Sequence, residues 1–373
     1  MKQKKEALKK QENNFLVASQ WQLIRWKFFK HKLAMGALIV LVIFYLSAIF
    51  AEFIAPNDAR MYNADYKYAP PQTIHFFDEE GNFHLRPFVY GYESKWEPEI
   101  YRTIYKEDKS LLYPIYFLVR GDSYKLFGLF PGNIHLFGTK EGKLFLFGTG
   151  EFGRCVLSKI IYGGRISLSI GLVGIAISSI IGIIIGGLSG YFGGKIDIFV
   201  QRIIEVIISI PTIPLWMALS VALPPFWSIT RVYFGITIIL SMVTWTTLAR
   251  VVRGKFLALR EEDYVMAARM SGAGEGRIIF RHILPSFTSH IIATLTLSIP
   301  TMIIGETTLS FLGLGMRPPA ISWGVLLKEA QQIRILEYAP WILLPAVFVV
   351  ISILAFNFVG DGLRDASDPY SNI

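Results

Sequence analysis

The sequence contains a single cysteine, Cys155, among 373 residues. One thiol excludes an internal disulfide and any zinc or iron–sulfur site that needs several cysteines. The six histidines show no metal-ligand spacing, and the chain has no H-E-x-x-H or G-x-S-x-G motif. It also has no G-x-x-x-x-G-K-[ST] loop, so it does not bind ATP in the P-loop manner. We therefore expect a protein that is not an enzyme and binds no cofactor or metal itself.

One string, GTGEFG at 148–153, matches the dinucleotide fingerprint G-x-G-x-x-G. The fingerprint requires an acidic residue about 20 positions later and a βαβ unit around it. Here no acidic residue occurs between Glu151 and Asp197, and an apolar run follows instead. The string is better explained as a turn that leads into an interfacial helix.

Charged residues are also scarce, at 17% of the chain, whereas 53% of the residues are hydrophobic and the mean hydropathy is +0.44. That composition is typical of a membrane protein. The net charge of +9 does not indicate nucleic-acid binding, because the basic residues flank apolar runs rather than gathering on one face or tail.

Six apolar stretches have roughly the 20 residues that a helix needs to cross the bilayer core. They are residues 33–51, 166–192, 206–223, 232–249, 287–312 and 338–360. The first is too long for the apolar region of a signal peptide and has no clean cleavage site, so we predict an uncleaved anchor. The predicted fold is an all-α integral membrane protein with six transmembrane helices.

Basic residues near the ends of these stretches predict the orientation. The tail 1–32 carries nine Lys and Arg residues, and the loop between the fourth and fifth stretches carries seven, so both should be cytoplasmic. Six spans then place the C-terminal tail, 361–373, in the cytoplasm as well. The predicted organisation is the tail 1–32, a first helix 33–55, an extracytoplasmic insertion 56–147, a five-helix core 148–360 with a cytoplasmic loop 250–285, and the tail 361–373.

The insertion is predicted to be small and β-rich. The sequence TIHFF-DEEGN-FHLR is typical of a hairpin, and LFG recurs at 126–128, 136–138 and 146–148, which favours a short meander of strands. Two roles stay open for it: contact with an external partner or substrate, or a cap on the outer helix ends.

Small residues and prolines mark two of the spans. Gly182, Gly186, Gly190 and Gly194 recur every fourth residue, which favours close packing of the second span on another helix. Pro211 and Pro214 predict a kink in the third span, and kinked helices often line a pathway.

Two carboxylates lie in membrane stretches, Glu205 near the start of the third span and Glu306 toward the outer end of the fifth. A charge at mid-bilayer costs roughly 2.5–3.5 kcal/mol, so such residues tend to face water or a partner. Each could line a substrate path. Each could equally reach the interface or cap a neighbouring element.

The cytoplasmic loop contains a short predicted helix over residues 262–271. Glu262 and Asp263 suit its N-terminal end, Arg269 suits its C-terminal end, and Gly272 is a natural stop. One face carries a ring, two methyl groups and a hydroxyl, a shallow surface that suits docking into another protein. These residues are Tyr264, Ala267, Ala268 and Ser271. Packing against its own bundle is the alternative.

This loop resembles the EAA loop of ABC importer permeases, whose pattern is E-A-A, three residues, G, nine residues, I-x-L-P. Matching positions are held by Ala267, Ala268, Gly272, Leu284 and Pro285, while Met266 replaces the glutamate and His282 the isoleucine. The segments FGTGEFGRCVLSKIIYGGRISL, ETTLSFLGLGMRPPAISWG and LAFNFVGDGLRDASDP are similar to further landmarks of the oligopeptide, dipeptide and nickel branch. The resemblance covers residues 146 to the C-terminus.

The resemblance implies the "C" permease subunit of a type I ABC importer in the inner membrane. Its implied partners are a homologous second permease, two ATPase subunits that hold ATP and Mg²⁺, and an external solute-binding protein. Residues 262–271 would form the coupling helix, and peptides or nickel would be the cargo. An ATP-independent channel or carrier would instead predict inverted repeats or intramembrane charge chains, and neither is evident.

Overall fold

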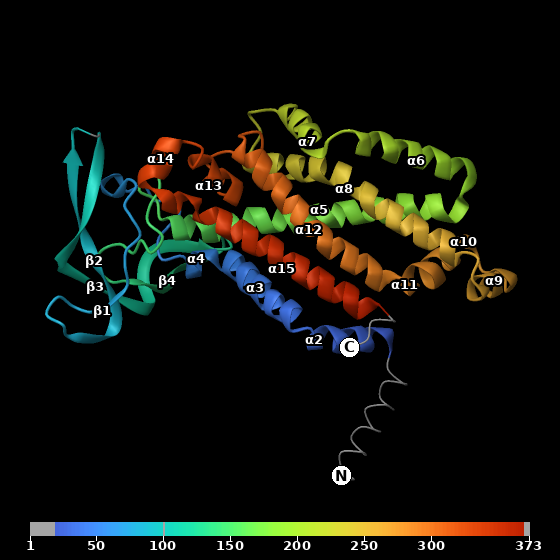
Figure 1. Cartoon of the computed structure of the whole chain (residues 1–373), viewed down its shortest axis with the longest axis horizontal. Coiled ribbons are helices and arrows are strands. Elements are labelled where there is room, and N and C mark those ends of the chain that lie inside the picture. The colour runs from blue at the N-terminus through green and yellow to red at the C-terminus, as the bar shows by residue number, and fades with distance from the viewer. Residues whose placement is uncertain (1–18, 100, 369–373) are drawn as a thin grey trace, which may run out of the picture.

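The computed structural model describes residues 19–99 and 101–368, and the following statements concern those residues. Long helices lie side by side along the molecule, and a small sheet covers one end of them (Figure 1). Five helical units are long and apolar enough to cross a membrane. They are α3 (Lys32–Ile49), α5 (Val156–Phe192), α8 (Ile229–Leu259), α12 (Thr288–Phe311), and η3 (Pro340–Leu343) continued by α15 (Leu344–Ser367).

The predicted third span is not a single helix. The chain forms α6 (Gly194–Ser209) and α7 (Thr212–Val221), which meet at 87°. The break lies at Ile210, which is extended with φ −88° and ψ 129°. Pro211 follows it, and a proline disfavours helical geometry in the residue before it. The kink predicted from Pro211 and Pro214 is therefore a full break, and the sixth span depends on counting this bent pair as one crossing.

Helix bounds elsewhere agree with the predicted stretches to different degrees. α12 agrees closely with 287–312, but α5 begins ten residues before 166, and α8 extends past 232–249 at both ends. Polar residues at these helix ends are stabilised by contacts that hydropathy does not register, such as the ion pair of 2.6 Å between Lys159 and Glu329. The predicted turn at 148–153 leads directly into α5 rather than into a separate interfacial helix.

Short helices connect the long ones. α2 (Gln20–Lys30) begins with a capping box at Ser19 and lies within the predicted tail 1–32, whose first 18 residues are outside the described part. The others are α4 (Ala51–Ile54), η1 (Ala64–Tyr66), α9 (Asp263–Met270), α10 (Glu275–Arg277), the π-helical η2 (Ile278–Ile283), α11 (Leu284–Ser286), α13 (Trp323–Glu329) and α14 (Ile333–Tyr338).

The insertion contains a four-stranded antiparallel sheet in the order β1-β2-β3-β4. Its strands are β1 (His75–Phe77), β2 (Phe83–Glu97), β3 (Arg102–Leu126) and β4 (Phe130–Thr139). The predicted hairpin agrees with the pairing of Phe77 with Phe83. The expected meander is present, because strands that follow one another in the chain are neighbours in the sheet. Its ten-residue period is wrong, because β3 alone has 25 residues and the third LFG lies in a turn outside the sheet.

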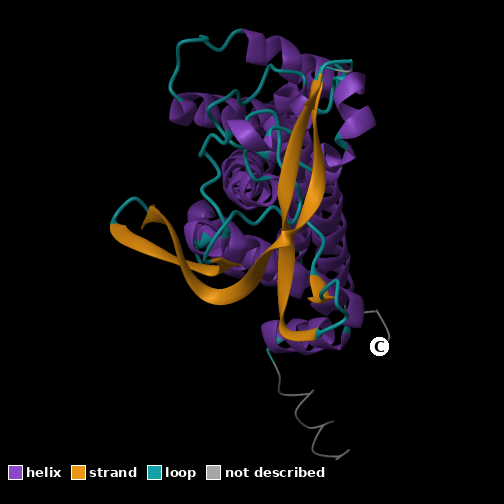
Figure 2. Ribbon diagram, turned by 90° about the vertical axis from the view of Figure 1, so that its left-hand side faces the viewer, coloured by secondary structure: helices purple, strands orange, loops and turns teal. Residues whose placement is uncertain are grey.

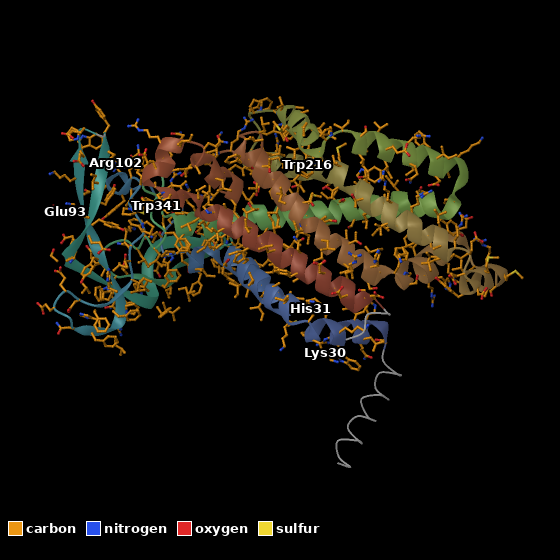
Figure 3. All side chains as sticks on the ribbon, in the orientation of Figure 1. Lys30, His31, Glu93, Arg102, Trp216 and Trp341 are labelled. Carbon is orange, nitrogen blue, oxygen red and sulfur yellow. The ribbon has the colours of Figure 1, made fainter. Side chains whose placement is uncertain are left out.

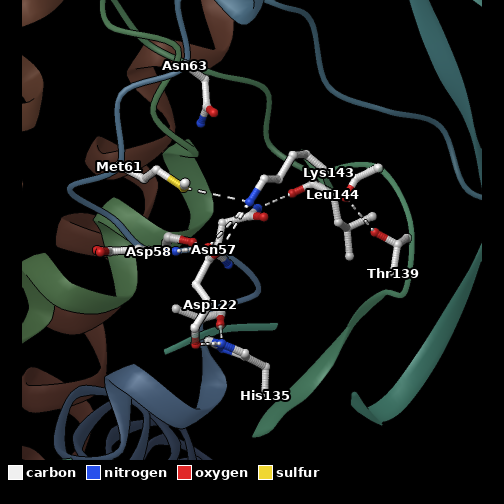
Figure 4. A network of polar contacts seen from close by, with 12 residues as sticks. Asn57, Asp58, Met61, Asn63, Asp122, His135, Thr139, Lys143 and Leu144 are labelled. Carbon is white, nitrogen blue, oxygen red and sulfur yellow. Dashed lines mark hydrogen bonds and ion pairs between the residues drawn. The ribbon is translucent and has the colours of Figure 1, made fainter. Parts of the chain in front are cut away.

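β3 belongs to two hairpins that diverge, as Figure 2 shows. Its first half pairs with β2, and its second half pairs with β4. A polar network fixes the second hairpin to the end of α4 (Figure 4). His135 contacts the carbonyl oxygen of Ala55 at 2.6 Å, Asn57 donates to the carbonyl of Leu144 at 2.6 Å, and Lys143 pairs with Asp122 at 3.2 Å.

The labelled side chains of Figure 3 mark two parts of the molecule. Glu93 and Arg102 lie on the sheet at one end, whereas Lys30 and His31 lie at the junction of α2 and α3, below the long helices. The main core lies between them, where α3, α5, α8, α12 and α15 pack around side chains such as Leu168, Leu240 and Met302.

Candidate functional site

The loop between α8 and α12 projects from the end of the bundle that is remote from the sheet (Figure 1). Within it, α9 has eight residues, about two turns rather than the predicted three. Glu262 occupies the N-cap position but makes no side-chain capping bond, and Asp263 lies in the first turn. The Ser271 hydroxyl donates to the Ala267 carbonyl at 2.8 Å, and Gly272 turns the chain with φ +77°. Arg269 lies in the last turn, as the sequence predicts.

One buried side chain attaches α9 to the long helices. Val265 is fully buried in a cluster with Tyr191 of α5, Phe256 of α8 and Ile291 of α12. Leu284 packs against the same cluster, whereas Pro285 is exposed. α9 packs on η2, so a displacement of α9 would reach the long helices through this shared apolar cluster.

The opposite face of α9 is open. Tyr264, Ala267 and Ser271 are exposed, and Ala268 is half-buried. Met266, at the position of the family glutamate, is 39% exposed and Met270 is 88% exposed. The predicted small-residue face is thus available, with two flexible thioethers beside it that suit contact with another protein.

α5 and α8 contact each other through the glycines. A Cβ on Gly186 would collide with the Ala249 carbonyl, and one on Gly190 would lie 2.6 Å from the Arg253 carbonyl oxygen. A Cβ on Gly182 would lie 3.0 Å from that of Leu248. We call this contact the α5–α8 seam. Gly194 is not part of it: α5 ends at Phe192, and Gly194 is the first residue of α6 with free space around it.

Charged groups lock the seam near α9. Arg253 of α8 donates to Asp197 of α6 at 2.6 Å, and Ser189 of α5 donates to the same carboxylate at 2.5 Å. Arg260, which follows α8, donates to the carbonyls of Gly190 and Tyr191 at 3.3 Å. These bonds join α5, α6 and α8. They lie close to Phe256 of α8, which belongs to the cluster that holds Val265.

The two membrane carboxylates have different surroundings. Glu306 is fully buried and accepts hydrogen bonds from Ser167 at 2.9 Å and Ser310 at 2.8 Å, so it joins α5 to α12. Glu205 is exposed on α6 and pairs with Arg202 at 2.7 Å. Pro211 and Pro214 are exposed at the start of α7.

A cavity of about 710 Å³ lies beside these prolines, among α6, α7, α8, α12 and α15. Neither carboxylate nor either proline lines it. Its walls carry three basic side chains and seven hydroxyl groups, and none of its lining residues is acidic. They are Arg250, His290 and Arg364, with Thr212, Thr244, Thr246, Thr247, Thr294, Ser298 and Thr301.

The hydroxyls of this cavity remain available to a solute. Thr244, Thr294 and Ser298 each donate to the carbonyl four residues earlier in the same helix, so their oxygen lone pairs are free to accept. Sequence reasoning missed this surface. The signal was the spacing of Thr294, Ser298 and Thr301, which places three hydroxyls on one face of α12.

Comparisons with known proteins agree with this architecture. Residues 179–371, about half of the chain, match the family described as "Binding-protein-dependent transport system inner membrane component". The chain belongs to that family. Residues 19–71 also match the N-terminal TM domain of oligopeptide transport permease C, a segment that contains α2, α3 and α4.

Several curated permeases are similar over the same region. The oligopeptide transport system permease protein OppC of Bacillus subtilis (strain 168) is 38% identical over 220 residues, 59% of this chain and 70% of that protein. The OppC protein of Haemophilus influenzae is 41% identical over 219 residues, 58% of this chain and 68% of that protein. A solved structure, titled as inward facing conformations of the MetNI methionine ABC transporter, covers 56% of this chain and 97% of that chain, with 21% identity and a TM-score of 0.44.

This permease is accordingly a multi-pass protein of the inner membrane and a component of a transport system with further parts. The matched region contains the loop with α9, the seam and the cavity. The sheet, by contrast, lies between the two matched segments.

Proposed function

We propose that this permease is the transmembrane subunit of an ATP-driven peptide importer and forms half of the translocation pathway. Its relatives of 38% and 41% identity are named as oligopeptide transport permeases. The observation that carries the proposal is α9, an exposed short helix whose buried Val265 belongs to the same apolar cluster as side chains of three long helices. Peptide is the favoured cargo because hydroxyl groups on the cavity wall suit the many N–H groups of a peptide.

The partners follow from this assignment. A homologous second permease completes the pathway, two ATPase subunits hold ATP and Mg²⁺, and an external solute-binding protein delivers the cargo. In the proposed orientation α9 and both termini are cytoplasmic, and the sheet lies outside. This arrangement follows the type I importer fold, with α6 and α7 together as the sixth crossing.

In the proposed cycle, α9 seats in a cleft of one ATPase. Closure of the ATPase pair displaces α9, and the Val265 cluster passes that displacement to α8 and α12. Those two helices carry Thr244 and Thr294 on the cavity wall, so the same movement changes access to the cavity. No chemical step on this chain is required.

A nickel or other small-solute importer of the same group is the alternative. The cavity walls carry Arg250, His290 and Arg364 without an acidic neighbour in the lining, which disfavours a bare divalent cation. An ATP-independent channel or carrier would leave the exposed face of α9 without a role.

The proposal is tested by placing a charge on that face. Ala267→Asp adds a carboxylate to the docking surface without disturbing buried contacts, since Ala267 is exposed. We expect the complex to insert and to hydrolyse ATP, while peptide uptake into proteoliposomes falls at least tenfold, about 1.4 kcal/mol of lost coupling.

Gly276→Asp is the matched control, because Gly276 lies in the same loop outside α9 and has open space around it. It should transport normally. Normal uptake by the Ala267→Asp complex would contradict the docking role of α9. Uptake without ATP would contradict the importer assignment itself.

A further inference from the structure

The turn between β3 and β4 consists entirely of apolar residues and glycine, and it is exposed. In the sequence LFGLF at 126–130, Phe127 is 53% exposed, Leu129 75% and Phe130 63%. Phe127 and Gly128 both have positive φ, and the Leu129 N–H donates to the Leu126 carbonyl at 3.1 Å. Asn-Gly is the pair that hairpin turns prefer where two successive residues have positive φ.

Phenylalanine is an unfavourable choice at that position. A bulky L-residue in the left-handed region costs roughly 1–2 kcal/mol, and an exposed ring gains nothing from water in return.

The contact that the ring makes is with the end of a membrane helix. The Phe127 ring lies 6.1 Å from that of Phe50, which directly follows α3. α3 has 18 residues, so its length is about 27 Å, close to the thickness of the bilayer core. Its other end carries Lys32. Phe127 consequently lies at the level where the opposite boundary of the bilayer must fall.

An apolar groove continues from the turn along the membrane helices. It has a volume of about 390 Å³, and Phe127 shares its lining with Tyr45 and Ile49 of α3 and with Leu168 and Leu172 of α5. Its exposed wall is almost free of polar atoms. The groove thus connects the hairpin directly with the surface that α3 offers to lipid.

Two hydrogen bonds tie the hairpin to the segment that follows α4. His135 of β4 contacts the Ala55 carbonyl at 2.6 Å, and Asp58 donates its backbone N–H to the Asp122 carboxylate of β3 at 3.1 Å. The hairpin extends sideways past the helices (Figure 2).

We infer that the β3–β4 turn is a lipid site: it inserts into the outer boundary of the bilayer, and Phe127 closes a groove that takes a phospholipid acyl chain. Aromatic and aliphatic side chains are favoured at this boundary. Lys125, exposed and adjacent to the turn, is placed to approach the phosphate. The inference requires α3 to span the membrane and is independent of the cargo and of ATP coupling.

Nitroxide labels measure the insertion directly. The full chain, with Cys155→Ser, carries a single label at Leu129→Cys in vesicles of phosphatidylcholine and phosphatidylglycerol. Oxygen concentrates in lipid, so frequent collision of the label with oxygen indicates a lipid environment. A water-soluble nickel chelate stays in water, so frequent collision with it indicates an aqueous environment. The matched control is Tyr101→Cys, at the end of the other hairpin, because Tyr101 also has positive φ and is 77% exposed. Val42→Cys on α3 is the lipid reference.

We expect the ratio of oxygen to nickel collision at position 129 to be several-fold higher than at position 101 and closer to that at position 42. Equal ratios at 129 and 101 would overturn the inference, because the turn would then lie in water. Low collision with both reagents at 129 would also overturn it, since a protein contact would cover the turn.

A second variant separates lipid contact from folding. Phe127→Asn installs a residue that tolerates positive φ, so the hairpin should remain folded. The collision ratio at 129 should then fall several-fold toward the value at 101. An unchanged ratio would show that Phe127 does not hold the turn in the lipid and would overturn its assigned role.

Discussion

Helices α5 and α8 correspond to the second and fourth predicted spans, and the α6–α7 pair corresponds to the third. The α5–α8 seam and the α6–α7 pair are nevertheless built in opposite ways. The seam brings backbone to backbone at Gly186 and Gly190 and is locked by Arg253. In α6 only Ile204 of sixteen residues is buried, and the chain bends by 87° before α7. Phe199 and Val206 remain 67% and 64% exposed.

The difference separates a helix contact that is formed within this chain from a helix pair that leaves most of its surface uncovered. The glycine face of α5 is covered by α8, whereas nearly all of α6 is exposed or half-buried. Under the proposed function the lipid and the second permease cover that surface. The seam is then the rigid part that carries displacement from α9, and α6–α7 is the part that meets neighbours. Three substitutions test this contrast.

The largest effect is expected from Gly186→Leu. Its side chain has no room against the Ala249 carbonyl, so α5 and α8 must separate. The free energy of unfolding in detergent should fall by about 3 kcal/mol or more. Gly254→Leu on α8 is the control, because a Cβ there meets nothing within 4 Å. Equal stability of the two variants would contradict the close packing of the seam.

An intermediate effect is expected from Asp197→Asn, which cuts the tie between α6 and the seam. Arg253 loses its charged partner, and because this pair is partly exposed the cost should be about 1–2 kcal/mol. The swap of Asp197→Arg with Arg253→Asp should recover part of the loss. Thermal unfolding of the single and double variants measures both. If the double variant lost more stability than the two single variants lost together, the result would argue against the ion pair.

The smallest effect is expected from Glu205→Gln on the exposed part of α6. The side chains of Arg202 and Glu205 are 76% and 52% exposed, and such i,i+3 pairs contribute about 0.2–0.5 kcal/mol. Stability and peptide uptake should both stay near those of the unchanged protein. A loss of transport with normal stability would instead restore Glu205 to the pathway.

Local sequence patterns predicted the helices and turns that depend only on residues close together in the sequence. The apolar run of α12 and the turn between Phe77 and Phe83 agree with the structure. The α9 helix was found for the same reason, with Gly272 as its stop. The break at Ile210 was underestimated as a kink, although the following proline contained the signal.

Features that depend on several helices could not be predicted in this way. The hydroxyl-rich cavity draws its lining from five helices. For Glu306 the sequence left open a place in the pathway and a contact with a neighbouring element. In the structure its carboxylate accepts hydrogen bonds from one serine of α5 and one serine of α12. The 25-residue length of β3 was not predicted either, because pairing with both β2 and β4 helps to define it.

The central claim is that α9 transmits the action of an ATPase to the long helices. Its most direct test is a cysteine at Ala267 in the Cys155→Ser protein, reacted with a water-soluble maleimide from the cytoplasmic side. We expect rapid modification of the permease without ATPase and strong protection in the assembled transporter, with a cross-link to the ATPase. Equal reactivity in both states, or reactivity only from the outer side, would contradict the account.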